Sequence, residues 1–214
     1  MNYIALYKNM LRIFGPQHWW PSESDIETLI GAILVQNTNW LNAEKSLNNI
    51  REKNNFVASE MLKLSAEDIK KLIIPSGFYN AKSRTIYNTL QYFSRFDLTT
   101  KSINSNKSTA QLRKELLNIK GIGNETADVI LLYVFQRPLF VADSYSRKMV
   151  GFFEKIPFQK LEYMKVKQKM EKELGCLTIK DFQEFHALID EHIIDYFKIY
   201  NREKNEKQKF TNNK

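Results

Sequence analysis

Cysteine is almost absent from this sequence, since Cys176 is the single thiol in 214 residues. One thiol excludes an internal disulfide framework, a cysteine-rich zinc site and any metal cluster that needs four thiolates from this chain. Long apolar runs are also missing, because Leu29–Val35 is far shorter than the roughly 20 residues of a bilayer-spanning helix. The N-terminus MNYIALYKNMLR has no signal-peptide cleavage pattern. We therefore expect a cytoplasmic protein in a reducing compartment, with no membrane partner.

The alternation of polar and apolar residues that marks a half-buried strand is scarce as well. Apolar residues instead recur at intervals of three and four in IETLIGAILV, LRKELLNI, ADVILLYVF and FHALIDEHIIDYF. Ser65 with Asp68, and Ser108 with Gln111, have the spacing of capping boxes that start helices. Glycine and proline breaks divide the chain into about ten helices. The sequence predicts an all-α fold.

Charge of one sign is in excess, with 32 Lys and Arg against 24 Asp and Glu, a formal charge of +8 and a pI near 9.4. This balance favours an anionic partner, with nucleic acid as the leading candidate. Many basic proteins have no polyanionic partner, so net charge alone is weak evidence for nucleic-acid binding. The basic segment 201–214, NREKNEKQKFTNNK, is expected to be a flexible tail.

The segment LRKELLNIKGIGNETADVILLYV predicts a helix-hairpin-helix within residues 112–136. The first helix is expected to end at Ile119, and Asn124 is expected to cap the second. Gly121 and Gly123 allow a backbone geometry and a close approach that a Cβ would obstruct. Between them, Ile122 can plug the turn into the core.

Such a turn leaves backbone N–H groups at the start of the second helix without partners, which suits a DNA phosphate. Lys114 and Lys120 lie close enough in sequence to add attraction. Contacts of this kind position DNA without reading its sequence. A Gly-x-Gly turn by itself also describes an ordinary corner between two helices.

The hairpin is followed by FQRPLFVADSYSRKMVGFF, and together the two segments resemble the endonuclease III group of helix-hairpin-helix DNA glycosylases. Upstream, LIGAILVQNTNW and IIPSGFYNAKSRTI are similar to further segments of that group, so the resemblance covers roughly residues 24–197. It implies two helical lobes that flank an active-site cleft within a domain of residues 1–200. The middle lobe would span about 38–137, and the N-terminal helices with about 138–200 would form the second lobe.

The resemblance implies that Asp143 is the catalytic carboxylate at the start of a helix. There it would stabilise the oxocarbenium-like sugar and orient or deprotonate the attacking water. An isolated aspartate before a helix is most often a simple N-cap, and both roles can hold at once.

Two departures from the family pattern change the expected chemistry. Bifunctional members carry a nucleophilic lysine two residues after the second hairpin glycine, where this chain has Glu125, 18 residues before Asp143. A carboxylate forms no Schiff base, so we expect a water nucleophile and no AP-lyase activity. The four-cysteine loop of endonuclease III is absent, so we expect no iron–sulfur cluster and no catalytic metal. A monovalent cation at the hairpin of the DNA complex is left open.

Trp19, Trp20 and Trp40 lie in two segments, HWWPSESD and VQNTNWLN, which suggest an aromatic base pocket. Stacking and cation–π attraction select a cationic alkylated purine such as 3-methyladenine. Together with PSGFYN and the exchange of lysine for Glu125, these segments resemble the bacterial 3-methyladenine glycosylase branch of the group. Core packing is an equally good explanation for each tryptophan taken singly.

Family position suggests that Gln36, beside Asn37, fills the gap left by a flipped nucleotide and that Phe78 wedges the opposite strand. The remaining predicted DNA contacts are the hairpin residues Lys120, Gly121, Ile122, Gly123 and Asn124. The three histidines, His18, His186 and His192, are expected to pack or cap rather than to bind metal.

Together these features predict a monomeric, monofunctional N-glycosylase that hydrolyses an alkylated purine from double-stranded DNA. Two alternatives remain at this stage. One is an endonuclease III-like glycosylase for oxidised or mismatched pyrimidines, and the other is a non-catalytic helix-hairpin-helix DNA-binding protein.

Overall fold

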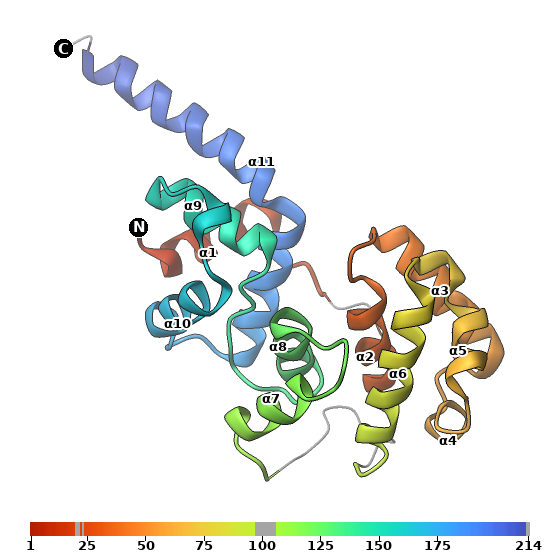
Figure 1. The fold of residues 1–214 in the computed structure, drawn as a ribbon. Coiled ribbons are helices and arrows are strands. Elements are labelled where there is room, and N and C mark those ends of the chain that lie inside the picture. The colour runs from red at the N-terminus through yellow and green to blue at the C-terminus, as the bar shows by residue number, and fades with distance from the viewer. Residues whose placement is uncertain (20–21, 23, 97–105, 213–214) are drawn as a thin grey trace. The chain divides into compact units, whose positions relative to one another are not determined.

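The protein is described by a computed structural model. It covers residues 1–19, 22, 24–96 and 106–212, with side chains as far as residue 205. In these residues the chain forms eleven α-helices and two short 3-10 helices and contains no strand, which confirms the all-α prediction (Figure 1). No helix in this part of the chain is both long and apolar enough to cross a membrane.

The chain divides into two compact units, which we call unit 1 (residues 1–19 and 140–214) and unit 2 (residues 20–139). Unit 2 contains α2 (Asp25–Leu34), α3 (Trp40–Asn54), α4 (Ala58–Met61), α5 (Ala66–Leu72), η1 (Ile74–Ser76), α6 (Tyr79–Phe93), α7 (Thr109–Leu117) and α8 (Asn124–Tyr133). Unit 1 contains α1 (Tyr3–Phe14), α9 (Ser144–Glu154), η2 (Phe158–Lys160), α10 (Tyr163–Glu173) and α11 (Ile179–Asn212).

Helix α2 is the centre of unit 2, because every one of its residues is buried. It packs against α3, α6 and α8. The sequence DIETLIGAIL has apolar side chains on all sides, as expected for a helix enclosed by others. The prediction that the helices before residue 38 belong to the second lobe was therefore wrong for α2.

Both predicted capping boxes are present in unit 2. At the start of α5, the Ser65 hydroxyl accepts from the Asp68 amide, and the Asp68 carboxylate accepts from the Ser65 amide. Ser108 and Gln111 make the same reciprocal pair at the start of α7. These local patterns fix helix starts because each satisfies two backbone donors that the helix leaves free.

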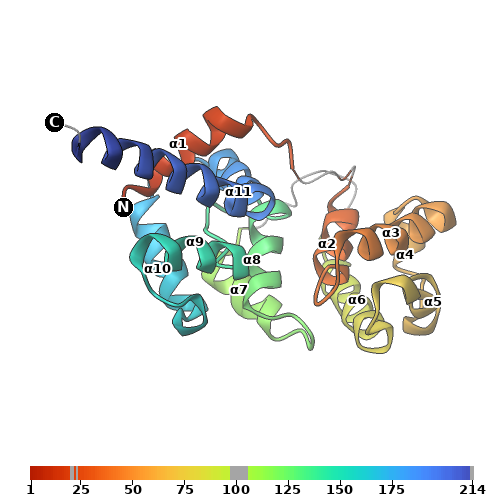
Figure 2. The same ribbon diagram turned by 90° about the horizontal axis from the view of Figure 1, so that it is seen from above.

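Unit 1 is built around α11, which packs against α1 and α9, and Figure 2 shows α1 lying alongside it. The buried apolar face of α11 consists of Phe182, Phe185, Ala187, Leu188, Ile189, Ile193 and Tyr196. At the edge of this face, Phe197 stacks on Phe152 of α9 with ring centroids 4.0 Å apart. Aliphatic and aromatic packing therefore holds the C-terminal region of unit 1.

The expected flexible tail after residue 200 is not a separate segment. Helix α11 continues to Asn212 and extends beyond α9 (Figure 1). The segment NREKNEKQKF contains neither glycine nor proline and is rich in Lys, Arg, Glu and Gln, which are good helix formers. Adding a residue to an existing helix needs no new nucleus, so the packed part of α11 can propagate outward.

Candidate functional site

Asp143, the predicted catalytic carboxylate, is the N-cap of α9 in unit 1 and is only 6% exposed. Its Oδ1 accepts a hydrogen bond of 2.6 Å from the amide of Ser146. The Ser146 hydroxyl in turn donates to the carbonyl of Val141, which closes the turn before the helix. The Asp143 side chain therefore satisfies a backbone donor at the start of α9.

Two residues of α11 that the sequence analysis did not assign to the site lie beside Asp143. His186 is 6% exposed, and its Nε2 lies 3.4 Å from Oδ2 of Asp143. Asp190 follows one turn later, and the pKa of its carboxyl is raised to about 6, chiefly by burial and then by the charge of Asp143. A histidine and an aspartate four residues apart within the apolar pattern FHALIDEHII were the available signal.

The aromatic edge of this cluster is Trp19, which is half-buried in unit 1. Its ring meets the ring of His186 edge to face, with centroids 5.3 Å apart. Trp40 begins α3 in unit 2 and is also half-buried, while Trp20 lies outside the described residues. A pocket shared by the three tryptophans stays a prediction.

The hairpin in unit 2 has the tight geometry expected of its first glycine. Gly121 has a φ of +98°, and a Cβ there would come within 2.0 Å of Oγ1 of Thr85. Ile122 is buried at 6% exposure and anchors the turn. A Cβ on Gly123 would meet nothing within 4 Å, so no crowding inside the protein requires that glycine.

The ends of the hairpin helices differ from the prediction. Helix α7 ends at Leu117 rather than Ile119, and Gly123, not Asn124, is the N-cap of α8. No side chain caps α8, because its N-cap is a glycine. The Asn124 amide oxygen accepts from Nη2 of Arg113 at 2.8 Å. The first amides of α8 thus have no side-chain acceptor from the cap, as an anion-binding helix end requires.

The predicted plug and wedge residues also belong to unit 2. The Gln36 amide donates to the Gly121 carbonyl at 3.3 Å and to Oγ1 of Thr126 at 2.7 Å, so it is held against the hairpin. Its neighbour Asn37 is exposed with a φ of 51°. Phe78 is 68% exposed with a φ of 47°, a conformation that costs energy for an aromatic residue. An apolar ring held outward at such a position is available to a partner.

The residue at the lysine position of bifunctional relatives, Glu125, is exposed in the first turn of α8. Lys120 is exposed on the hairpin.

Cys176 is exposed and is the only thiol of the sequence, so the residues present do not fit a four-thiolate iron–sulfur cluster. In the described part of the chain, no group of three or more His, Cys, Asp or Glu side chains is arranged to hold a metal ion.

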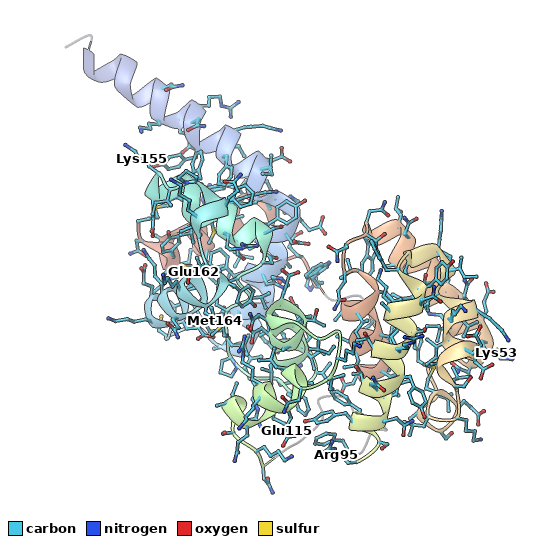
Figure 3. All side chains as sticks on the ribbon, viewed as in Figure 1. Lys53, Arg95, Glu115, Lys155, Glu162 and Met164 are labelled. Carbon is cyan, nitrogen blue, oxygen red and sulfur yellow. The ribbon has the colours of Figure 1, made fainter. Side chains whose placement is uncertain are left out.

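A polar hollow of unit 2 lies beside the hairpin. Figure 3 labels Arg95 and Glu115 at this end of the unit. Tyr92 donates to Glu115, and hydrogen bonds from Lys107 and Tyr92 lower the pKa of that carboxyl. Arg95 lies over the Tyr92 ring, 4.2 Å from its centroid. These groups satisfy one another, which makes the hollow a structural network of α6 and α7.

Unit 2 contains a helix-hairpin-helix, and unit 1 contains a buried aspartate, Asp143, that caps α9. These features define a helix-hairpin-helix protein. Residues 30–176 match the sequence pattern of the HhH-GPD superfamily of base excision DNA repair proteins. The chain belongs to this superfamily, which confirms the resemblance drawn from the motifs.

Individual relatives agree with this assignment. A protein of Methanocaldococcus jannaschii that carries the provisional name of a DNA repair glycosylase is 38% identical over 188 residues, which cover 87% of this chain and 84% of that protein. The crystal structure of an H. pylori 3-methyladenine DNA glycosylase bound to 1,N6-ethenoadenine superposes with a TM-score of 0.74 at 23% identity, over 92% of this chain and 99% of that one. An endonuclease III–DNA complex gives a TM-score of 0.68 at 16% identity, over 87% and 82%.

Proposed function

We propose that this protein is a monofunctional DNA glycosylase of base-excision repair. In this proposal it acts as a monomer on double-stranded DNA and hydrolyses the N-glycosidic bond of an alkylated purine such as 3-methyladenine. The observation that carries the proposal is the buried, N-capping Asp143, with its two oxygens facing Ser146 and His186, in a chain of the base-excision repair superfamily.

Asp143 would act on the sugar of the flipped nucleotide. Cleavage of the glycosidic bond leaves positive charge on the sugar ring, and a carboxylate fixed in a poorly hydrated place stabilises that charge more strongly than water does. Water then adds to the sugar carbon and loses a proton, which the carboxylate can accept. A cationic alkylated purine departs as a neutral base and needs no proton from the protein.

The same reasoning argues against a lyase step. Covalent catalysis needs an amine that forms a Schiff base with the opened sugar, and Glu125 has none. We therefore propose hydrolysis without strand cleavage, and without an iron–sulfur cluster or a catalytic metal.

The alkylated purine is the substrate class that the aromatic residues favour. Trp19 is half-buried beside the carboxylate cluster, and an electron-rich indole attracts a cationic base by about 0.5–2 kcal/mol per contact. The named substrate of the H. pylori neighbour points the same way. A neutral oxidised pyrimidine would gain less from an indole face and would need more hydrogen-bonding groups.

The hairpin would hold the DNA backbone. The N-terminus of α8 has no side-chain cap and, with exposed Lys120, suits a phosphate. Phe78 and Gln36 would enter the duplex where the base leaves it. The carbonyls of Lys120 and Gly121 each accept one hydrogen bond and keep a second lone pair, which a monovalent cation at the hairpin would use.

The decisive experiment is release of free base from duplex DNA treated with a methylating agent. We expect wild-type protein to release 3-methyladenine and Asp143→Asn to be slower by at least about 100-fold, because the substitution removes the negative charge and the base. Duplex binding should be kept. Asp195→Asn is the matched control, since Asp195 is an exposed carboxylate of the same unit paired with Lys198.

Strand nicking is scored in the same reactions before and after alkali. Breaks that need alkali support a monofunctional enzyme, whereas breaks without alkali contradict the interpretation of Glu125. No release of any alkylated base, with release from DNA containing oxidised or mismatched pyrimidines, would favour the pyrimidine alternative. Binding without turnover on any lesion would favour a non-catalytic DNA-binding protein.

A further inference from the structure

The carboxylate of Asp143 is held from two sides by different elements of unit 1. The Ser146 amide of α9 donates to Oδ1, and Nε2 of His186 from α11 lies 3.4 Å from Oδ2. A single amide leaves a carboxylate free to rotate about its last bond, and a second donor on the other oxygen fixes its plane. His186 is therefore placed to set the direction in which the charge of Asp143 acts.

His186 also contacts the aromatic side of the site. Its ring packs edge to face with Trp19, 5.3 Å between centroids. The segment before Trp19 is joined to α11 by two hydrogen bonds. The backbone N–H of Gln17 donates to the Glu184 carboxylate, and the side-chain oxygen of Gln17 pairs with Nε2 of His192 at 2.9 Å. Helix α11 thus positions both the carboxylate and the indole.

The third member of the cluster is Asp190, one turn after His186 on α11. Its carboxyl interacts electrostatically with both Asp143 and His186. Asp190 therefore adds a second acidic group beside the Asp143–His186 pair.

We propose that His186 is a positioning residue that orients the Asp143 carboxylate and the Trp19 ring for base removal. The proposal rests on the glycosylase function proposed above. His186 touches neither the sugar nor the attacking water in this scheme; it acts through Asp143, whose misplacement by about 1 Å can cost about 100-fold in rate.

Single-turnover base release separates positioning from binding. We expect His186→Leu to lower the rate at saturating enzyme by about 100-fold and to leave the dissociation constant for duplex DNA close to wild type. His186→Gln keeps an N–H donor near Nε2 and should recover most of the rate. Reactions are run below the melting temperature of each variant, and Asp195→Asn again serves as the control.

The outcomes distinguish this inference from the proposed function. If Asp143→Asn is inactive and His186→Leu is as fast as wild type, the positioning role is overturned and the glycosylase function stands. Equal rate losses in His186→Leu and His186→Gln would also overturn it, because the donor would then not be what matters.

A spectroscopic test needs no turnover. In proton–nitrogen spectra of the histidine rings, Asp143→Asn should move the His186 signals, while those of His192, which pairs with Gln17 on the same helix, should stay in place. Unchanged His186 signals would overturn the inference even if the protein removes no base at all.

Discussion

Lys82 shows what burial does to a single side chain in this protein. The structure buries it at 4% exposure in unit 2. Its ammonium donates to the carbonyls of Leu34 and Ser76, each at 2.7 Å. Lys82 therefore joins the end of α2 to the turn that carries Phe78.

We predict that Lys82→Met destabilises the protein by about 1–3 kcal/mol, because it leaves two carbonyls without their donor. Urea unfolding at constant pH measures the change. Lys71→Met is the matched control, since Lys71 is an exposed lysine of the same unit. A loss no larger than that of the control would contradict the buried hydrogen bonds.

The loss of stability caused by Lys82→Met should depend on pH. Burial lowers the pKa of Lys82 from 10.5 to about 8. Between these values the unfolded chain binds more protons at this lysine than the folded protein does, so its contribution to stability rises with pH through that window. The loss caused by Lys82→Met should be larger at about pH 9.5 than at about pH 7; equal losses would argue against the lowered pKa.

The hairpin is the element on which sequence and structure agree best. Its two helices are joined by Arg113 of α7, which binds both oxygens of the fully buried Asp128 of α8 at 2.8 and 3.2 Å. Charge-assisted pairs of this geometry hold helices in one orientation. The turn itself depends on Gly121, whose absent Cβ lets it approach Thr85.

The two hairpin glycines should respond differently to the same substitution. Gly121→Ala should lower the free energy of unfolding by about 1–3 kcal/mol, because its Cβ collides with Thr85 and its φ is positive. Gly123→Ala should leave the melting temperature near wild type and weaken duplex binding about tenfold, because its Cβ faces the space a phosphate would use.

Thermal melts and duplex titrations of both variants check this pair of effects. If Gly123→Ala binds DNA as wild type does, the phosphate does not approach that glycine. If Gly121→Ala is as stable as wild type, the backbone can move away from Thr85.

The whole molecule carries a formal charge of +8, so we expect the proposed duplex binding to depend on salt. Each phosphate neutralised by a lysine or arginine releases counterions, so affinity falls linearly on logarithmic axes. This term would add to binding by the hairpin without distinguishing one sequence from another.

We predict that Lys120→Ala reduces the slope of log affinity against log salt by about 0.9, the value for one lost phosphate contact. Lys63→Ala, which removes an exposed lysine paired with Glu60 in the same unit, should leave the slope unchanged. Equal slopes for Lys120→Ala and wild type would remove Lys120 from the interface.

The sequence alone determined the all-α fold, both capping boxes, the glycine turn with its buried Ile122, and the lack of thiolates for a cluster. These features depend on a few neighbouring residues or on composition, so no knowledge of distant contacts is needed. The family motifs added Asp143, and the structure places it at a helix start as expected.

Only the tertiary structure decided that α2 is the centre of unit 2, that Lys82 is buried and that His186 and Asp190 lie beside Asp143. The periodic pattern of α11 shows which face is buried but not which side chain of another helix that face meets. Such pairings depend on how helices pack, and packing joins residues that are far apart in the chain.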